Sequence, residues 1–351
     1  MKKWVNILWI IISFAATVTL AITLIIPHIP PQSSLNIFSS LNILFPYALI
    51  ISIICSITCL FRKQFYTFTW SVIILILSIP NTLNNISLYP SSSEADNSNA
   101  IKVCSYNVHY FNFYEQHGND ALAFLKNTDA DILCLQEVMV MTENNHTLDN
   151  LKKELSNYPY YHIEFIHEGN KSSKGIATFS KYPIIKRGKA SFLSDAHGAI
   201  STWITINDDT LQVINCYLES NRLTREEKEI YTSQEKTNLL KRVYNKLAKA
   251  SQKRGIQAQA IASMKDSQCP TLVCGDLNDV PTSYVYRTVL GKDQDCFLER
   301  DWGIGNTFHE GLYHFRIDYI FADDKIEPLS FQVNKQPYSD HYPIELQCKI
   351  K

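Results

Sequence analysis

Residues 271–279 read Thr-Leu-Val-Cys-Gly-Asp-Leu-Asn-Asp, an apolar run that ends in a glycine and is followed by two carboxylates and an amide. Such a run bounded by a turn residue is typical of a short buried strand, and the glycine lets the backbone bend after it. The bend presents Asp276 and Asn278 on the same side of the chain. Taken alone, Gly-Asp-x-Asn is more often a turn whose side chains bond their own backbone, so other segments must distinguish a turn from a site.

Four further segments place polar side chains at or within predicted strands. They are Ser-Tyr-Asn-Val at 105–108, Leu-Gln-Glu at 135–137, Arg-Ile-Asp-Tyr-Ile-Phe at 316–321 and Ser-Asp-His-Tyr-Pro at 339–343. Asp318 is the most informative residue, because an ionised carboxylate among apolar neighbours is costly unless a cation or hydrogen-bond partner compensates it. His341 is the candidate partner, although alone it would be read as a surface histidine. Together the segments predict a site built from carboxylates, amides and one histidine.

Strand-like runs alternate with polar loops from Ile101 onward. We predict strands at 101–108, 131–137, 175–180, 201–206, 211–217, 271–274, 315–321 and 344–349. A helix is expected at 120–127. The longest helical stretch, 223–264, opens with a capping box from Thr224 to Glu227 and is predicted to break at Gly255. Strands that outnumber helices without alternating strictly with them favour an α+β sandwich of two sheets flanked by helices.

The five polar segments, in this order, resemble the endonuclease/exonuclease/phosphatase superfamily, which includes deoxyribonucleases, apurinic endonucleases, neutral sphingomyelinases and inositol-phosphate phosphatases. The resemblance covers residues 101–349, and Gly-Ile-Ala-Thr-Phe-Ser-Lys-Tyr-Pro-Ile at 175–184 matches a further family segment. It implies a four-layered α/β sandwich of two packed mixed sheets, with the catalytic groups gathered at one end. It also implies an enzyme, a Mg²⁺-dependent phosphoesterase.

The resemblance implies a metal site and the residues that form it. Glu137 would bind the metal with Asn107 nearby, and Asp340 would reach its shell. This is an all-oxygen set of the kind that Mg²⁺ or Mn²⁺ prefers. Apurinic endonucleases carry an aspartate where this chain has His109, which weakens the analogy with their metal site. For His109, a structural role at a strand end and a functional role both stay open.

The same resemblance implies the catalytic roles. Asp276 would orient and deprotonate the attacking water, and Asn278 would hold a phosphate oxygen. His341, oriented by Asp318, would stabilise or protonate the phosphate as charge builds up. Tyr217 stands where several relatives carry a histidine and apurinic endonucleases a tyrosine, so its hydroxyl is a candidate phosphate donor. A cation and fixed donors of this kind neutralise the charge that protects a phosphodiester while water attacks in line.

Charge is distributed unevenly along the 351 residues. The first ninety contain four charged side chains, all basic, which leaves 29 Lys and Arg against 34 Asp and Glu in the remainder. A net negative domain does not suggest strong non-specific attraction to nucleic acid. A basic stretch could supply a local groove, but it reads more simply as a solvated loop; it comprises Lys171, Lys174, Lys181, Lys186, Arg187 and Lys189. Nine cysteines without any Cys-x-x-Cys spacing suggest neither a zinc site nor a regular disulfide framework.

Two uncharged apolar runs near the N-terminus, 4–26 and 41–61, are long enough to cross a bilayer as helices. A cleaved signal peptide is the rival for the first run, but the run is long and ends in Pro-His-Ile-Pro rather than at a small-residue cleavage site. A third run, about 65–80, is short enough for a re-entrant segment to compete with a span. We therefore predict two or three transmembrane helices in an anchor at 1–80, a linker at 81–100, and the catalytic domain at 101–351.

The side of the membrane depends on the third run. Basic residues at 2–3 and 62–63 place the start of the first span and the end of the second in the cytoplasm. If the third run spans, the catalytic domain lies outside the cytoplasmic membrane, on the periplasmic face, and the lack of Lys and Arg from 81 to 101 favours this. If it does not span, the domain is cytoplasmic.

The sequence leaves the substrate open. A nuclease would prefer a basic groove lined with aromatic side chains, whereas a phospholipid or small-phosphodiester hydrolase would suit an anchored, mildly acidic domain. The expected partners are thus a phosphate ester and the lipid bilayer; no protein partner is predicted. A non-catalytic binding protein on the same fold is disfavoured, because none of Glu137, Asp276, Asn278 and His341 is lost. A membrane scaffold would not explain acids at strand ends.

Overall fold

The computed structural model describes residues 2–32, 36–89, 100–112, 120–142, 146–190, 194, 196–224, 227, 236–310 and 313–351. The chain forms two compact units. The sheet unit consists of Ile86–Ser220, Ile256–Asp279 and Thr288–Lys351. The helical unit consists of Met1–Asn85, Asn221–Gly255 and Val280–Arg287.

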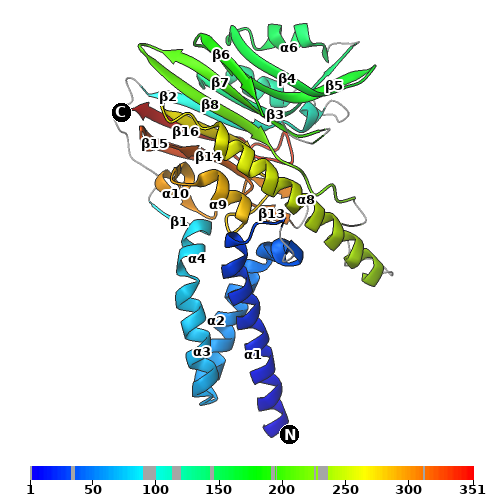
Figure 1. Cartoon of the computed structure of the whole chain (residues 1–351), viewed down its shortest axis with the longest axis vertical. Helices are drawn as coiled ribbons and strands as arrows, with labels where there is room; N and C mark the ends of the chain where they lie inside the picture. The colour runs from blue at the N-terminus through cyan, green and yellow to red at the C-terminus, as the bar shows by residue number, and fades with distance from the viewer. Residues whose placement is uncertain are drawn as a thin grey trace. The chain divides into compact units, whose positions relative to one another are not determined.

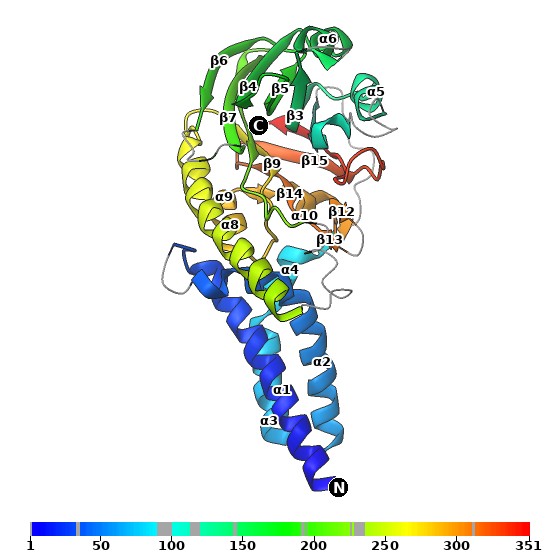
Figure 2. The ribbon, with the colours of Figure 1, turned by 90° about the vertical axis from the view of Figure 1, so that its right-hand side faces the viewer.

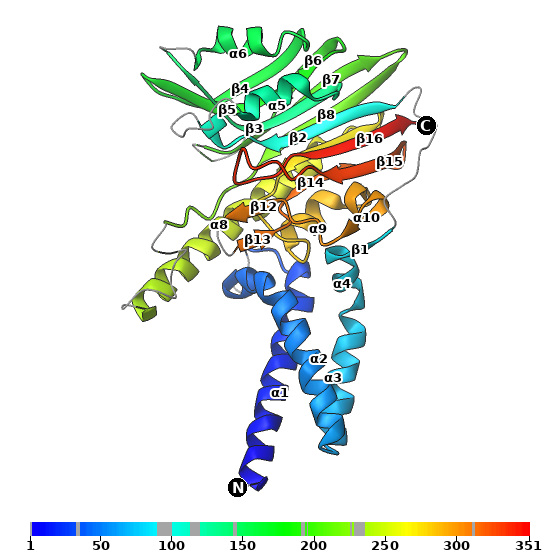
Figure 3. The same cartoon turned by 180° about the vertical axis from the view of Figure 1, so that it is seen from behind.

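Two six-stranded mixed sheets form the sheet unit (Figure 1). The first has the order β15-β16-β2-β3-β5-β4, with β2 between β16 and β3 (Figure 3), and the second has the order β10-β14-β9-β8-β7-β6. β2 runs parallel to β3 and β8 parallel to β9, and the other neighbours are antiparallel. The strands of the first sheet are β2 (Ile101–Asn107), β3 (Ile132–Met141), β4 (Tyr160–Glu168), β5 (Ser172–Ser180), β15 (Ile326–Val333) and β16 (Ile344–Ile350). Those of the second are β6 (Ile184–Lys189), β7 (Gly198–Ile206), β8 (Asp209–Tyr217), β9 (Thr271–Asp276), β10 (Gln294–Asp295) and β14 (Asp318–Ala322).

Alternation of apolar side chains along these strands builds the core. Val103 of the first sheet and Val213 of the second belong to one buried cluster between the sheets. Helices α5 (Asp120–Asn127) and α6 (Leu148–Glu154) cover the outer face of the first sheet (Figure 2). The end of α8 (Lys236–Met264) flanks the second, where the β8 side chain of Gln212 donates to the carbonyl of the last α8 residue (2.8 Å). The predicted sandwich of two mixed sheets flanked by helices is confirmed.

Small elements complete the sheet unit. β1 pairs with β11 and β12 with β13, each pair antiparallel. Two short helices lie near these strands, and the residues of α9 are divided between the two units. The bounds are β1 (Ser87–Leu88), α9 (Tyr284–Leu290), α10 (Cys296–Arg300), β11 (Trp302–Gly303), β12 (Phe308–Glu310) and β13 (Tyr313–Phe315). The predicted linker therefore includes a strand, while residues 90–99 of it lie outside the described residues.

The prediction of one strand over 315–321 is wrong, because the chain leaves β13 and enters β14 of a different sheet. Arg316 lies at the change of direction and makes a buried ion pair with Asp295 (2.6 Å). The N–H of Ile317 donates to the hydroxyl of Thr307 (3.1 Å) instead of to a strand. Side-chain partners distant in sequence end the strand here.

The predicted helix break at Gly255 is also wrong, since α8 runs through it. A Cβ at this position would lie 2.9 Å from Cδ of Pro31 and 3.0 Å from Nε2 of Gln32. The glycine thus permits close packing inside the helical unit and does not end the helix. The capping box is confirmed: the N–H of Thr224 donates to Oε2 of Glu227 (2.8 Å), whose own N–H donates to the Thr224 hydroxyl (3.3 Å).

The helical unit presents apolar side chains outward and small polar ones inward. Ser13, Ser52 and Ser71 are buried, whereas Ile11 and Ile50 are exposed. This is the reverse of a soluble bundle and suits packing in lipid through small residues. Figure 2 shows α1, α2 and α3 side by side. The bounds are α1 (Lys2–Ile25), η1 (Ile26–His28), η2 (Asn36–Leu44), α2 (Phe45–Phe61), α3 (Phe65–Leu77) and α4 (Ile79–Asn85).

Among the described residues, two helices are long and apolar enough to cross a membrane, Trp4–His28 and Phe38–Phe61. A third crossing arises if α3 and α4, which are bent by 49° relative to each other, form one span. These helices can serve as a membrane anchor.

Candidate active site

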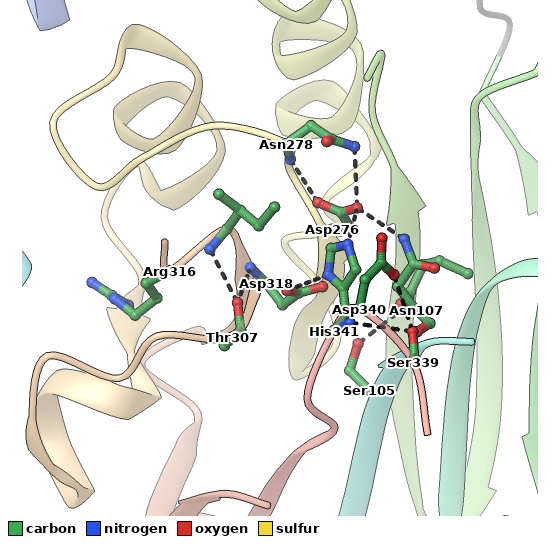
Figure 4. A network of polar contacts seen from close by, with 12 residues as sticks. Ser105, Asn107, Asp276, Asn278, Thr307, Arg316, Asp318, Ser339, Asp340 and His341 are labelled. Carbon is green, nitrogen blue, oxygen red and sulfur yellow. Dashed lines mark hydrogen bonds and ion pairs between the residues drawn. The ribbon is translucent and has the colours of Figure 1, made fainter. Parts of the chain in front are cut away.

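Strand register brings predicted site residues to one end of the second sheet. Tyr217 ends β8 and Asp276 ends β9, and the two are partners across the parallel pair. Asp318 begins β14 and faces Asp276 across the antiparallel pair. Asn107 ends β2 of the other sheet, and its amide reaches Asp276 (Figure 4). Residues more than 200 positions apart therefore share one cluster.

Asp276 is the most constrained of these residues. It is 1% exposed. Oδ1 accepts from the backbone N–H of Asn278 (2.7 Å), and Oδ2 from the side-chain amides of Asn278 (3.1 Å) and Asn107 (3.0 Å). Burial, and then the nearby carboxylate of Asp318, raises the pKa of Asp276 to about 8. A carboxyl group with this pKa exchanges a proton near neutrality, which suits a general base.

We expect the metal-free protein to lose stability as the pH rises from about 4 to about 8. Between the ordinary pKa of 3.8 and the raised value of about 8, folded Asp276 holds a proton that the unfolded chain releases. Raising the pH therefore favours the unfolded state across this window. The measurement is thermal unfolding in detergent with chelator, comparing the wild type with Asp276→Asn. Equal pH slopes for the two proteins would contradict the assignment.

His341 and Asp318 form a buried pair beside Asp276. Nδ1 of His341 lies 2.8 Å from Oδ2 of Asp318, and its Nε2 lies 3.9 Å from Oδ2 of Asp276. Burial alone lowers the pKa of His341, but the two carboxylates outweigh it and hold that pKa well above its usual value. The N–H of Asp318 donates to the hydroxyl of Thr307 (3.1 Å), which fixes the start of β14. An imidazolium held in this way can pass a proton from Nε2 to a nearby oxygen.

A bulge in β3 turns Glu137 toward Asn107. The register of β3 against β5 shifts between Leu135 and Val138, so the alternation of faces moves by one residue. Glu137 has a left-handed φ of 52°, and its Oε1 accepts from Nδ2 of Asn107 (3.1 Å). Without the extra residue, the Glu137 side chain would lie on the same face of the sheet as Leu135, which is the outer face that the helices cover. The expected strand end at Glu137 is corrected, because β3 continues to Met141.

Asp340 precedes His341 in the segment before β16, and Figure 4 shows it among the other residues of the cluster. The hydroxyl of Ser339 lies 2.8 Å from the carbonyl of Asn107 and 3.2 Å from Oδ1 of Asp340, which joins this loop to the end of β2. Nδ1 of His109 is 3.6 Å from Oδ1 of Asp340, and the His109 side chain is 42% exposed. His109 is therefore a rim residue next to a candidate ligand.

Tyr217 is buried beside Glu137, to which its side chain is hydrogen-bonded. Burial, followed by the carboxylates of Glu137 and Asp276, holds the pKa of Tyr217 well above its usual value. The phenol therefore stays protonated and remains a hydrogen-bond donor. All eight residues predicted for the site are in one connected neighbourhood.

The model of the Endonuclease/Exonuclease/phosphatase family matches residues 104–341. The chain belongs to this family. No curated protein matches its sequence.

The solved structures that resemble the chain include two of this family. The endonuclease/exonuclease/phosphatase from Beutenbergia cavernae DSM 12333 is 14% identical with a TM-score of 0.53, and the match covers 72% of each chain. A family protein from Leptotrichia buccalis C-1013-b is 18% identical with a TM-score of 0.52, and the match covers 72% of this chain and 100% of that one. At these identities the likeness shows the shared fold.

Two further residues of this family member, His197 and Glu219, escaped the sequence analysis. The His197 ring lies against that of Tyr217, with centroids 4.5 Å apart. Its Nδ1 lies 3.0 Å from Oε2 of Glu219, and its Nε2 accepts from the N–H of Ser220 (3.1 Å). Both side chains are buried. The available signal was Glu219 itself, an acid two residues beyond Tyr217 in an apolar run, to which the burial argument used for Asp318 applies equally.

We expect Glu219→Gln to lower turnover roughly tenfold and to weaken metal binding, as loss of an outer hydrogen-bond partner does in metal sites. Glu219 acts through two other residues. It orients His197, and the His197 ring packs against Tyr217, which contacts Glu137. The measurement is metal-dependent turnover, with Glu164→Gln as a control at a half-exposed Glu that pairs with Lys189. Unchanged metal dependence would limit Glu219 to a structural role.

A divalent cation fits the oxygen-rich side of the site. Glu137 and Asp340 offer carboxylates and Asn107 offers an amide, which are ligands that Mg²⁺ and Mn²⁺ prefer. The amide of Asn107 bridges the carboxylates of Glu137 and Asp276. The amide oxygen now accepts from the backbone N–H of His109 (3.1 Å). To face a cation between the carboxylates, the amide would make a half-turn and exchange this bond and its bonds to Glu137 and Asp276 for the cation. The residues present are therefore compatible with the metal that the family implies.

A second group also resembles a metal site. The potential ligand atoms of Asp276, Asp318 and His341 all lie within 4.8 Å of one another. Nδ1 of His341, however, is already bonded to Asp318 (2.8 Å), and without a cation the two carboxylates hold the pKa of His341 well above its usual value. This group suits proton transfer better than cation binding.

Gly275 allows β9 to approach β8 closely. Its φ is 140°, and a Cβ there would lie 2.0 Å from the carbonyl oxygen of Cys216. We expect Gly275→Ala to lower the free energy of unfolding by about 3 kcal/mol or more, since the clash is with backbone. Gly303→Ala is the control, because Gly303 also has a positive φ (93°) but nothing within 4 Å. Similar losses in chemical unfolding of the two variants would contradict the close-approach argument.

Many of the basic side chains between 171 and 189 have internal partners. Lys181 pairs with Asp131 (3.2 Å), and Lys174 lies over the ring of Tyr110 (4.2 Å). In the same way, Lys186 lies over the ring of Trp203, Arg187 donates to the carbonyl of Tyr161, and Lys189 pairs with the carboxylate of Glu164. This stretch therefore gives little support to a groove for nucleic acid.

Proposed function

We propose that the chain hydrolyses phosphate esters by in-line attack of water, with a divalent cation, while anchored in a membrane. The observation that carries this proposal is an unbroken series of contacts. It runs from Glu137 through Asn107 and Asp276 to His341 and Asp318, at 3.1, 3.0, 3.9 and 2.8 Å. This series supports a proton acceptor and a proton donor working beside carboxylates and an amide that can hold a cation.

Asp276 is the proposed general base, because its buried carboxyl has a pKa of about 8. Asn278 holds this carboxyl with its backbone N–H and its amide, and the amide also donates to the carbonyl of Leu218 (3.0 Å). Both amide hydrogens of Asn278 are therefore used. Contact with a phosphate oxygen would require one of these bonds to be exchanged.

His341 is the proposed proton donor, and Asp318 orients its ring and stabilises its charged form. Nε2 is the nitrogen left for the reacting phosphate, since Nδ1 is bound by Asp318. Tyr217 is a second donor, a neutral phenol on the side of Glu137. Its one proton would have to move from Glu137 to the phosphate. Donors fixed before the reaction stabilise the charge that develops in the transition state.

Glu137, Asn107 and Asp340 would hold the cation, proposed to be Mg²⁺, with Mn²⁺ as a substitute. When bound, it neutralises phosphate charge and lowers the pKa of water. The oxygen-only donor set supports this choice.

A phospholipid or small phosphodiester is the second candidate substrate beside nucleic acid. The engaged basic stretch and the excess of Asp and Glu beyond residue 90 favour it. Turnover should be measured on duplex and abasic DNA, RNA, sphingomyelin and inositol phosphates, each with Mg²⁺ and with chelator. Activity that persists in chelator would refute the metal-dependent mechanism.

We further propose that the anchor lies in the cytoplasmic membrane with the catalytic unit on the outer, periplasmic face. This requires α3 and α4 to form the third crossing, which their combined length and apolarity allow. Protease added to intact spheroplasts should then cleave the catalytic unit. Protection until lysis would place the unit in the cytoplasm.

A further inference from the structure

An exposed apolar patch on the sheet unit lies outside the active-site cluster. Leu88, Tyr89, Trp302 and Ile304 are 62%, 52%, 64% and 59% exposed; we call them the β1–β11 patch. Leu88 and Trp302 are paired across the β1–β11 ladder, so their side chains are direct neighbours. Single exposed apolar residues are ordinary, whereas contiguous ones mark interaction surfaces.

The patch is firmly attached to the sheet unit. Ser87 of β1 is buried, and its hydroxyl donates to the carbonyl of Leu298 in α10 (3.0 Å). Gly305, with a φ of 64°, leads the chain away from Ile304 so close to Phe297 that a Cβ would lie 2.3 Å from its ring. The patch is therefore a fixed surface.

Chain length keeps this patch close to the end of the third apolar segment. α3 and α4 together are long and apolar enough to form a broken span or a re-entrant segment. In both cases the segment would end at a membrane surface. The segment ends at Asn85, three residues before Leu88. At roughly 3.3 Å per residue, Leu88 lies within about 10 Å of that end.

The composition of the patch matches the boundary between headgroups and acyl chains. Tryptophan and tyrosine have an apolar body and a polar tip, and they concentrate at this depth. No Lys or Arg occurs at 85–89 or at 301–306. Binding should therefore depend on apolar burial and not on attraction to anionic lipid.

We propose that the β1–β11 patch docks into the lipid interface, so that the sheet unit is held to the bilayer at a second point in addition to its helical anchor. The inference goes beyond the proposed chemistry and does not depend on it. It does mean that the catalytic unit would work at a fixed height above the lipid.

The test uses the full chain in phosphatidylcholine liposomes, with an environment-sensitive fluorophore at Ile304→Cys. Ile185→Cys is the matched control, because Ile185 is 60% exposed and lies on β6 of the same unit. Both carry Cys269→Ser, since Cys269 is the cysteine that is not buried. Nitroxide-labelled acyl chains report contact with lipid, and aqueous iodide reports contact with water.

We expect a blue shift and roughly threefold stronger nitroxide quenching at position 304 than at 185, with weaker iodide quenching, as for side chains at the interface. Added NaCl should leave this difference unchanged. Equal quenching at both positions would overturn the proposal. Protection of position 304 from both quenchers would also overturn it, because a second copy or another protein would then cover the patch.

Discussion

Asp276→Asn is expected to lower turnover of a phosphate ester roughly 10²- to 10⁴-fold, the usual contribution of a positioned general base. The substitution keeps the shape of the side chain and the acceptor for the N–H of Asn278. It places an amide nitrogen where Oδ2 now accepts from the amides of Asn278 and Asn107, so some stability is lost. It removes the group that can take a proton from water. Since the carboxyl has a pKa of about 8 and is largely protonated at neutral pH without metal, the fold should survive. Single-turnover kinetics and thermal unfolding in detergent measure the two effects.

Asp295→Asn is the matched control for this prediction. Asp295 is also buried, but it pairs with Arg316 away from the cluster. Its loss should lower stability, because a buried guanidinium keeps its charge without its partner, while turnover per folded molecule stays near normal. The role of Asp276 as base would be refuted if its variant kept turnover, or if it lost activity only in proportion to folded protein.

The sandwich could be predicted because its strands carry their own signals. The sequence predicted α5 with the bounds that the structure shows, and apolar strand patterns found β8 and β16 within two residues of their ends. Where long-range partners override the local pattern, sequence reasoning failed. Gly255 resembles a helix breaker, but its role is contact with Pro31. The segment around Arg316 resembles a strand in sequence, but Arg316 pairs with Asp295 in another part of the chain and the strand is interrupted there.

The sequence predicted which residues form the candidate site better than it predicted how the backbone positions them. A carboxylate among apolar neighbours indicates a partner, and this argument led to Asp318 and His341. The bulge that redirects Glu137 has no signal of its own, because a register shift depends on the neighbouring strand. His197 could be identified only once Glu219 and Tyr217 were seen beside it.

Glu137→Gln is expected to raise the Mg²⁺ concentration for half-maximal turnover by roughly 10²-fold or more. Loss of a residue that only hydrogen-bonds a metal ligand lowers metal affinity by about 10- to 100-fold, and loss of a charged ligand should have at least the upper effect. Gln keeps an oxygen that can accept from the amide of Asn107, so the bulge and the cluster should persist. The negative charge that attracts the cation is lost. Mn²⁺ binding followed by calorimetry gives the same comparison without any substrate.

Comparison of this variant with Asp276→Asn separates a ligand from a base. Glu137→Gln should recover turnover in excess Mg²⁺, because saturation restores the bound ion and leaves the base intact. Asp276→Asn should bind Mn²⁺ nearly as the wild type does and stay inactive at any Mg²⁺ concentration. If Glu137→Gln bound Mn²⁺ normally while Asp276→Asn did not, the cation would belong with Asp276, Asp318 and His341, whose ligand atoms lie within 4.8 Å. The proton-transfer role of that group would then fail, since a histidine bound to metal through Nε2 has no proton to give from it.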